Sequence, residues 1–335
     1  MTRSVDSELV AGWLAAVLKV THAAENRIPD FRFPMLATLA LAAAGALNHC
    51  SPSSVVPPSC VRGGPTHVDP TMTRRAQLGF VLGCGCWACA APPADALAAF
   101  TAPPAELLRQ YDLQRNAMKD AGFAAGMATG MRDYEKAVSP TKRRIFDQML
   151  SALPAQANAE PLVVELGMGS FPNAPFYASA KQPLDIVGVD PNDSMTGYAM
   201  QNAAPLLKAG SSVRVRHGVG EALPFASRSV DAVVCTLTLC SVPTPEVVLA
   251  DVKRVLKPGG QFVFLEHVKS ETDENLARQQ ELLNPSQVQR ADGCNLNRRT
   301  LQIIKDANFA SLDAEYFELK DFYVLNPTVA GIAKA

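Results

Sequence analysis

From residue 160 to the end of the chain, short apolar runs alternate with longer amphipathic stretches. Leu162–Leu166 and Leu184–Asp190 are rich in β-branched residues, and runs of this length are typical of buried parallel strands. The pattern predicts strands near residues 162–166, 184–189, 212–216, 230–236, 260–268, 312–319 and 322–333, and helices near residues 173–180, 193–208, 244–256, 272–283 and 298–307. Such alternation predicts an α/β fold, a seven-stranded, mostly parallel sheet flanked by helices.

Proline and glycine residues mark where further helices are expected to begin or end. Pro103 opens a predicted helix that runs to about Gly130, because proline is tolerated in a first helical turn. A second helix is predicted from Ser139 to Leu150, with Ser139 as its cap and Pro140 in its first turn. Lys257–Gly260 predicts a helix stop and a tight turn into the next strand.

The first 98 residues have the composition of a targeting region. No acidic residue occurs from Phe31 to Val68, and Met35–Leu47 is an apolar run too short to span a membrane. Further on, Thr73-Arg74-Arg75 precedes the apolar run Leu78–Ala91, and Ala96-Leu97-Ala98 supplies small residues for cleavage. Together these resemble a transit peptide followed by a twin-arginine signal.

The 335 residues thus divide into three parts: a targeting region at 1–98, a helical segment at 99–155 and the main domain at 156–335. The expected location is the chloroplast, in the stroma or associated with the thylakoid; an endomembrane association is the alternative. Residues 1–98 are also compatible with an extension that has no role in the fold, or with a true start at Met35 or Met72.

Composition excludes some functions. A formal net charge of −1 gives no electrostatic reason to expect a nucleic-acid partner. No apolar run reaches 20 residues, so no permanent membrane span is expected, although an anchor at 78–91 and peripheral membrane association stay open. The spacing of Cys84, Cys86 and Cys89 lacks partner histidines, and we predict no metal site.

Two strand ends carry the candidate chemistry. Gly167 and Gly169 follow the first strand, where missing side chains let a ligand lie against the main chain. Asp190 ends the second strand, 25 residues after Glu165, where an acid can accept hydrogen bonds from both hydroxyls of a ribose. A nicotinamide dinucleotide and S-adenosylmethionine both fit this geometry. The dinucleotide fingerprint needs a glycine where Pro172 stands, so S-adenosylmethionine is favoured.

From about Tyr134 onward the chain resembles the class I S-adenosylmethionine-dependent methyltransferases. The motifs that carry this resemblance are Glu165-Leu-Gly-Met-Gly, Val189-Asp190-Pro191-Asn192, Gly220-Glu221-Ala222-Leu223-Pro224-Phe225, Ser229-Val230-Asp231-Ala232-Val233-Val234 and Arg254-Val255-Leu256-Lys257-Pro258-Gly259-Gly260. Within the class it is most similar to the microsomal alkyl thiol methyltransferases, the methyltransferase-like seven group. The supporting residues are Tyr134-Glu135-Lys136, Lys142-Arg143-Arg144, Val234-Cys235-Thr236-Leu237, Leu239-Cys240-Ser241-Val242, Glu266-His267-Val268 and Asp292-Gly293-Cys294-Asn295-Leu296.

The resemblance implies a Rossmann-like fold and a set of donor-binding residues. Glu165 would orient the amino end of the donor, Asp190 would bind the ribose and Glu221 would lie near the adenine. The complete predicted set is Glu165, Gly167, Gly169, Asp190, Pro191, Gly220, Glu221, Cys235 and Thr236. Two departures from the family pattern are Phe171, in place of a third glycine, and Val219, in place of an acid. Phe171 is expected either to crowd the methionine part of the donor or to stack beside it.

His267 is the first candidate for a catalytic base, because imidazole titrates near neutrality. A purely structural histidine is the alternative, and Asp292 is a competing base. Cys240 and Cys294 are expected to be small packing residues, and His217 a structural histidine. A thiol acceptor needs little help from a base, whereas a phenol needs more.

The resulting prediction is an S-adenosylmethionine-dependent methyltransferase of a small, fairly apolar acceptor, with a thiol favoured by the resemblance. Two alternatives remain: methylation of a quinone or another prenyl lipid, and a non-catalytic regulatory protein that binds S-adenosylmethionine.

Overall fold

The computed structural model describes residues 101–155 and 160–335. The targeting region expected at 1–98 lies outside the described residues, and the domain boundaries drawn from it stay predictions. Among the described helices, none combines the length with the apolar composition that a membrane crossing requires.

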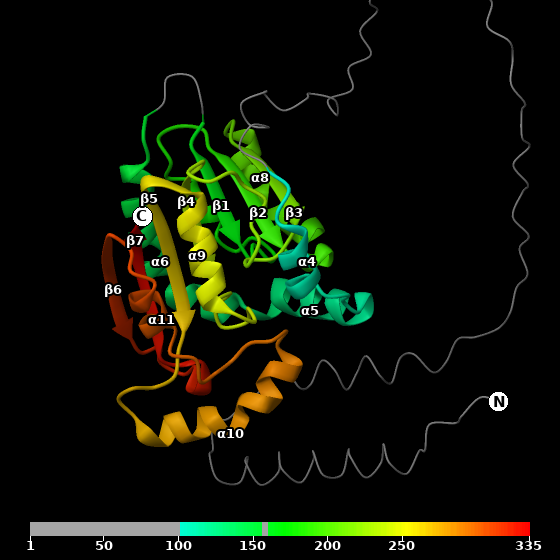
Figure 1. Ribbon diagram of the computed structural model, residues 1–335. Helices are drawn as coiled ribbons and strands as arrows, with labels where there is room; N and C mark the ends of the chain where they lie inside the picture. The colour runs from blue at the N-terminus through cyan, green and yellow to red at the C-terminus, as the bar shows by residue number, and fades with distance from the viewer. Residues whose placement is uncertain (1–100, 156–159) are drawn as a thin grey trace, which may run out of the picture. The chain divides into compact units, whose positions relative to one another are not determined.

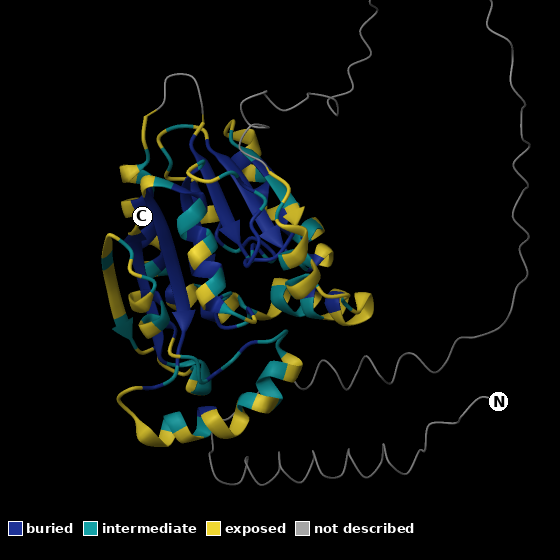
Figure 2. Cartoon of the chain, in the orientation of Figure 1, coloured by how far each residue is buried: buried dark blue, intermediate teal, exposed yellow. Residues whose placement is uncertain are grey.

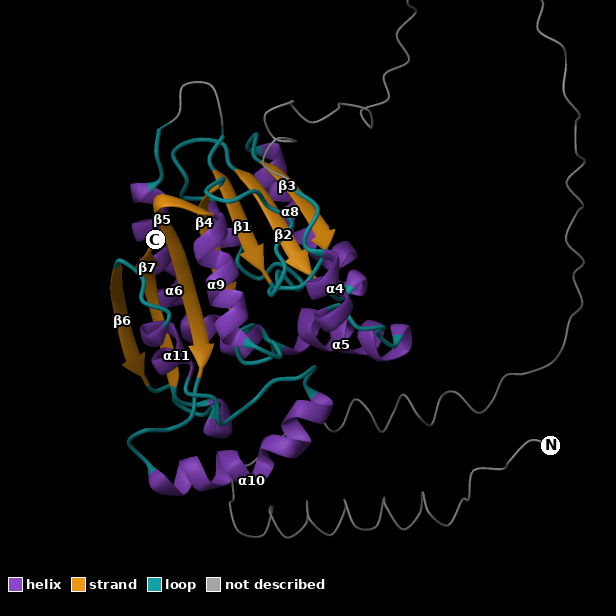
Figure 3. Cartoon of the chain, viewed as in Figure 1, coloured by secondary structure: helices purple, strands orange, loops and turns teal. Residues whose placement is uncertain are grey.

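A seven-stranded sheet confirms the predicted fold class, with strands in the order β3-β2-β1-β4-β5-β7-β6 (Figure 3). The strands are β1 (Leu162–Leu166), β2 (Asp185–Asp190), β3 (Ser212–His217), β4 (Val230–Thr236), β5 (Leu256–His267), β6 (Ser311–Phe317) and β7 (Thr328–Lys334). The five strands from β3 to β5 pair in parallel, and β7 is antiparallel to both β5 and β6. The strand order reverses between β1 and β4, and sheets of this type bind ligands outside the carboxyl ends of the strands at such a point.

Helices cover both faces of the sheet (Figure 1). They are α4 (Ala105–Tyr111), α5 (Ala117–Gly130), α6 (Arg132–Ala152), α7 (Ala174–Tyr177), α8 (Thr196–Lys208), α9 (Pro245–Val255), α10 (Glu274–Arg290) and α11 (Thr300–Asp306), with the 3-10 turns η1 (Asp193–Met195) and η2 (Tyr323–Leu325). α5 and α10 lie at the end of the sheet to which the parallel strands point, so both helices border the ligand-binding edge.

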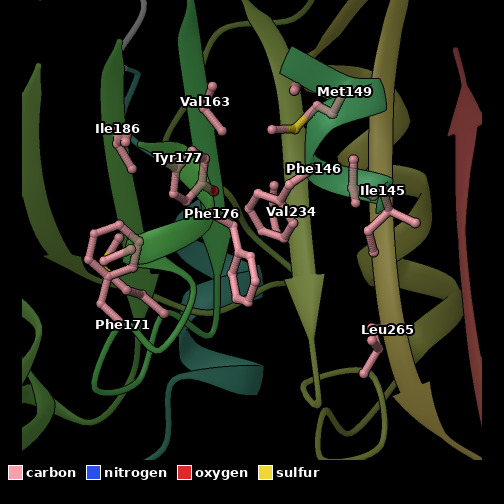
Figure 4. Close-up of a cluster of buried hydrophobic side chains, with 14 of the residues drawn as sticks. Ile145, Phe146, Met149, Val163, Phe171, Phe176, Tyr177, Ile186, Val234 and Leu265 are labelled. Atoms are coloured by element: carbon pink, nitrogen blue, oxygen red, sulfur yellow. The ribbon is translucent and has the colours of Figure 1, made fainter. Parts of the chain in front are cut away.

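Two hydrophobic cores form because successive strand residues point to opposite faces. Val163 packs on the face covered by α6, α7 and α8, and its neighbour Val164 packs on the face covered by α9 and α11. In the first core, the Phe146 ring meets the Tyr177 ring edge-on at a centroid distance of 5.0 Å (Figure 4). The central strands are buried on both faces (Figure 2), which accounts for their continuous apolar runs.

The helices before the sheet differ from the prediction. The helix expected from Pro103 to Gly130 is two helices, α4 and α5, separated by residues 112–116. The next helix starts at Arg132, and Pro140 lies inside it rather than in its first turn. Proline leaves the carbonyl of Lys136 without its helical partner, but both residues are exposed, so water can satisfy that carbonyl.

The Lys257–Gly260 segment agrees with the prediction only in part. α9 ends at Val255, so the predicted helix stop is confirmed. The turn itself belongs to the start of β5, where the pairing with β4 shifts register between Val230 and Ala232. Gly259 has a φ of +77°, a backbone conformation that glycine adopts at little cost.

Candidate active site

The glycine turn after β1 begins the site. Gly167 and Gly169 have φ values of +63° and +56°. A Cβ at Gly167 would lie 2.2 Å from Oγ1 of Thr238, so the loop after β4 requires glycine there. A Cβ at Gly169 would meet no atom closer than 3.9 Å, and the residue is partly exposed. Open space beside the main chain at Gly169 therefore allows a ligand to approach.

Asp190 ends β2 beside this turn. One carboxylate oxygen accepts a hydrogen bond from the Gly169 amide, and the other accepts one from the Asn192 amide, both at 2.8 Å. Burial raises the pKa of Asp190, and the two amide hydrogen bonds oppose that rise. Each carboxylate oxygen has a second lone pair, so Asp190 can hold the turn and still accept hydrogen bonds from a ligand.

Glu165 belongs to a buried network of side chains. One of its oxygens accepts a hydrogen bond from the Tyr177 hydroxyl at 2.5 Å, and the other accepts one from the Asn173 amide. Lys142 completes the network: its Nζ, on a side chain 1% exposed, donates to Asn173 at 2.8 Å and to Glu135 at 2.7 Å. Burial raises the pKa of Glu165 to about 7, although the hydrogen bonds from Tyr177 and Asn173 act in the opposite direction.

Lys142 and Asn173 were not predicted as site residues from the sequence. The available signal was the resemblance, which includes Tyr134-Glu135-Lys136 and Lys142-Arg143-Arg144. Asn173 also donates to Oγ1 of Thr236 at 3.0 Å, so one amide group joins the ends of β1 and β4. Cys235 is fully buried in β4, with its side chain in the opposite core.

Phe171 does not point into the turn. Its side chain is fully buried in the core beneath α7, 5.8 Å from the Tyr177 ring between centroids (Figure 4). Neither expectation for this residue holds, since the ring packs in the first core and neither crowds nor stacks beside a ligand at the glycine turn. Phe171 adopts a left-handed backbone conformation, with a φ of +61°, and the chain can therefore turn here without a third glycine.

On the far side of the turn, Glu221 is buried near the start of α9. Its carboxylate accepts a hydrogen bond from the Thr244 amide at 3.2 Å, and burial raises its pKa. Gly220 is packed against Leu166 and Val248, at 3.2 Å from where a Cβ would be. Pro191, next to Asp190, is partly exposed.

The sequence matches known methyltransferases. Residues 164–264 match a family model described as a methyltransferase domain. The rat thiol S-methyltransferase TMT1B is 36% identical over 186 residues, which cover 55% of this chain and 73% of the rat protein. The human thiol S-methyltransferase TMT1A is 30% identical over 210 residues, which cover 60% of this chain and 80% of the human protein. The chain belongs to the S-adenosylmethionine-dependent methyltransferases.

Among solved structures, a complex of the Haloferax volcanii Trm112 methyltransferase activator with a putative methyltransferase aligns with a TM-score of 0.46. The aligned residues are 19% identical and cover 66% of this methyltransferase and 99% of the solved chain.

In this methyltransferase, Glu266 shapes the loop after β4. Its buried carboxylate accepts hydrogen bonds from the amides of Thr238 at 2.8 Å, Leu239 at 2.9 Å and Cys240 at 3.3 Å. Burial raises the pKa of Glu266, and these amides counteract the rise. The carboxylate therefore fixes the same loop that touches Gly167 through Thr238.

His267 lies next to two cysteines, a proximity that the sequence analysis did not predict. Its Nε2 is 3.0 Å from the Cys294 sulfur, and the ligating atoms of Cys240, His267 and Cys294 all lie within 4.8 Å of one another. All three residues are buried, as expected of packing cysteines. Hydrogen bonds with Cys240 and then with His267 lower the pKa of Cys294, against the effect of burial.

Asp292, the competing base, forms an ion pair. Both of its oxygens accept hydrogen bonds from Nη2 of Arg115, at 2.9 and 2.8 Å, and Arg115 also binds Asp120 at 2.8 Å. Arg115 therefore joins the start of α5 to the loop after α10. We call residues 112–120 the strap.

Other contacts hold the strap at the ligand-binding edge. Asn192 donates from its amide to the Asp120 carbonyl at 3.1 Å, within two residues of Asp190. His217 lies between Asp193 at 2.9 Å and Asp112 at 3.0 Å, which agrees with a structural histidine. Burial opposes the imidazolium charge, but hydrogen bonds to the two acids outweigh it and raise the pKa of His217.

Proposed function

We propose that this methyltransferase transfers a methyl group from S-adenosylmethionine to the sulfur of a small, fairly apolar thiol. The observation that carries the proposal is the hydrogen bond from Gly169 to Asp190, which joins the glycine turn after β1, where the strand order reverses, to the acid that ends the neighbouring strand β2. Relatives described as thiol S-methyltransferases support the choice of acceptor, since this chain covers 73% and 80% of two of them.

The residues present fit the donor. Gly169 leaves open space against the main chain, and Asp190 retains a free lone pair on each oxygen for the ribose hydroxyls. We assign Gly220, Glu221 and Pro191 to the adenine end. The methionine end is assigned to Gly167, Thr236 and Cys235. Glu165 acts on the amino group indirectly, through Asn173, because its own carboxylate is buried and binds Asn173 and Tyr177.

Methyl transfer to sulfur is an in-line displacement at the methyl carbon of S-adenosylmethionine. The positively charged donor sulfur is a good leaving group. The chain must hold donor and acceptor in line and exclude water, and positioning of this kind lowers the barrier substantially. The hydrogen bonds between Asp190, Gly169 and Asn192 keep the turn fixed before any ligand arrives. The strap, held by Arg115 and His217, contacts Asn192 two residues from Asp190, and its proposed role is to restrict water at the same edge.

A thiol is the acceptor class that needs the least base catalysis from these residues. A few per cent of a free thiol is ionised near neutral pH, and the thiolate is the nucleophile. His267 is buried and Asp292 is paired with Arg115, so neither is offered as an exposed base. We propose the chloroplast as the compartment, on the composition of residues 1–98 alone.

A titration of S-adenosylmethionine into the full-length protein by calorimetry tests the donor site. We expect binding that is lost in Asp190→Ala and retained in Asp313→Ala, a matched control at an exposed acid on β6. A methyl-transfer assay then compares an alkyl thiol with a quinol. Binding unaffected by Asp190→Ala would refute the donor site, and transfer only to the quinol would replace the thiol with a prenyl-lipid acceptor.

A further inference from the structure

Three soft or borderline ligands meet outside the donor site. Cys240 comes from the loop after β4, His267 from the end of β5 and Cys294 from the loop after α10. Their ligating atoms lie within 4.8 Å of one another, and the exposed fractions of the three residues are 2%, 2% and 8%. Two thiolates and one imidazole within this distance form a donor set that matches zinc.

The protein itself holds these ligands together. Asn295, next to Cys294, donates to the Cys240 carbonyl from its main-chain amide at 2.9 Å and from its side chain at 3.0 Å. A Cβ at Gly293 would come within 2.8 Å of the Ser241 carbonyl, so the two loops touch at a glycine with a φ of +87°. The approach of the two sulfurs is therefore built into the loop packing and needs no ligand to form.

The imidazole ring supplies an independent observation. Nδ1 of His267 is buried without a hydrogen-bond partner among the described residues, whereas Nε2 faces the Cys294 sulfur. A neutral imidazole that offers its Nε2 lone pair carries its proton on Nδ1. Nε2 is therefore the ring nitrogen that faces the sulfurs, 3.0 Å from the Cys294 sulfur, and it is the nitrogen available to an ion held by both cysteines.

We propose that Cys240, His267 and Cys294 bind a zinc ion, and that the sulfur of the acceptor thiol occupies its fourth position. Three protein ligands with one open position are typical of catalytic zinc, whereas structural zinc is usually bound by four. Iron–sulfur clusters are held by four protein ligands, one more than this cluster offers.

The cluster includes a residue of the loop that contacts the glycine turn of the donor site. A role for zinc in methyl transfer rests on the proposed function. Thr238 touches the glycine turn, and Cys240 lies two residues further along the same loop. Coordination to zinc deprotonates a thiol, and its proton leaves to solvent. The thiolate sulfur then attacks the methyl carbon, a new carbon–sulfur bond forms, and the electron pair of the broken bond stays on the donor sulfur as a neutral thioether.

Metal analysis of the full-length protein after zinc loading and gel filtration tests the site. We expect one equivalent of zinc per chain that is lost in Cys240→Ser and in Cys294→Ser, and retained in Cys235→Ser, a buried cysteine of β4 outside the cluster. This difference separates the cluster from the cysteines of residues 1–98. Equal zinc in all four proteins would overturn the proposal.

Cobalt substitution of the wild-type protein provides a measurement that does not depend on whether a variant folds. We expect sulfur-to-cobalt charge-transfer absorption, displaced by one equivalent of zinc, and a change in the visible bands when an alkyl thiol is added. Absence of these bands in the cobalt-loaded wild-type protein would also overturn the site.

Activity separates the two proposals. Zinc binding without methylation of any thiol would leave the metal site and refute the thiol as acceptor. Equal rates of thiol methylation with loaded and chelator-treated protein would leave the proposed function and refute the role of the fourth position.

Discussion

Phe171 combines a buried ring with a left-handed backbone. A non-glycine residue at a φ of +61° costs on the order of 1–2 kcal/mol, whereas removal of a buried phenylalanine ring costs about 3–5 kcal/mol. Phe171→Ala and Phe171→Gly should therefore both lower the free energy of unfolding. The glycine variant should be the more stable of the two by about 1 kcal/mol, because glycine relieves the backbone. Urea denaturation measures both values, and an alanine variant at least as stable as the glycine variant would contradict the backbone argument.

The buried carboxyl of Glu165 should make stability depend on pH. Its pKa is about 7 in the folded protein against 4.5 for the free side chain, so the folded state binds the proton more tightly. The contribution is fully present below about pH 4.5 and is lost as pH rises through 7; the difference is on the order of 3 kcal/mol. Between pH 5 and pH 7.5, the free energy of unfolding in urea should fall more for the wild type than for Glu165→Gln. The same loss in both proteins would exclude Glu165 as the cause.

At the scale of elements, the strap should act on the donor site through one ion-pair unit. Arg115 contacts both Asp120 and Asp292, and the side chains are only 12–26% exposed. Arg115→Ala should weaken S-adenosylmethionine binding severalfold and speed hydrogen exchange in α5, with a stability change of about 1 kcal/mol or less. Arg109→Ala, at an exposed arginine of α4, is the control.

A double variant distinguishes this role from catalysis by Asp292. If Asp292 only anchors Arg115, Arg115→Ala combined with Asp292→Ala should weaken donor binding no more than either change alone. Additive losses, or a loss of methyl transfer in Asp292→Ala at saturating donor, would instead support Asp292 as a base.

The elements differ in how well the sequence predicts them. β1, β2 and β4 agree with the prediction to within a residue or so, because a run of β-branched residues bounded by turns fits few other structures. Pro140 misplaces the predicted start of α6, since a local proline signal competes with an apolar face that begins at Tyr134. The cluster of Cys240, His267 and Cys294 is not predictable in this way. Its residues lie 27 positions apart in sequence and meet only through the packing of two loops.

At the scale of the molecule, both hydrophobic cores lie within the described residues. The helices before the sheet differ in how many residues they bury in these cores. α6 supplies Tyr134, Val138, Ile145, Phe146 and Met149 to the first core. α4 buries no residue, and α5 buries only Asp120 and Ala124. The fold should therefore depend on α6, whereas donor binding should depend on the strap between α4 and α5.

Two truncations test this division and the boundary predicted at residue 98. The 99–335 protein should unfold cooperatively and bind S-adenosylmethionine as tightly as the full chain, because Thr101 retains its hydrogen bond to the Pro224 carbonyl at 3.2 Å. The 131–335 protein should also fold, because it retains α6 and both cores, but its affinity should fall further than in Arg115→Ala, since every contact of the strap is lost. Circular dichroism with urea denaturation measures folding, and calorimetry measures affinity. Loss of cooperative unfolding in the 99–335 protein would show that the first 98 residues support the fold, which a removable targeting region cannot do.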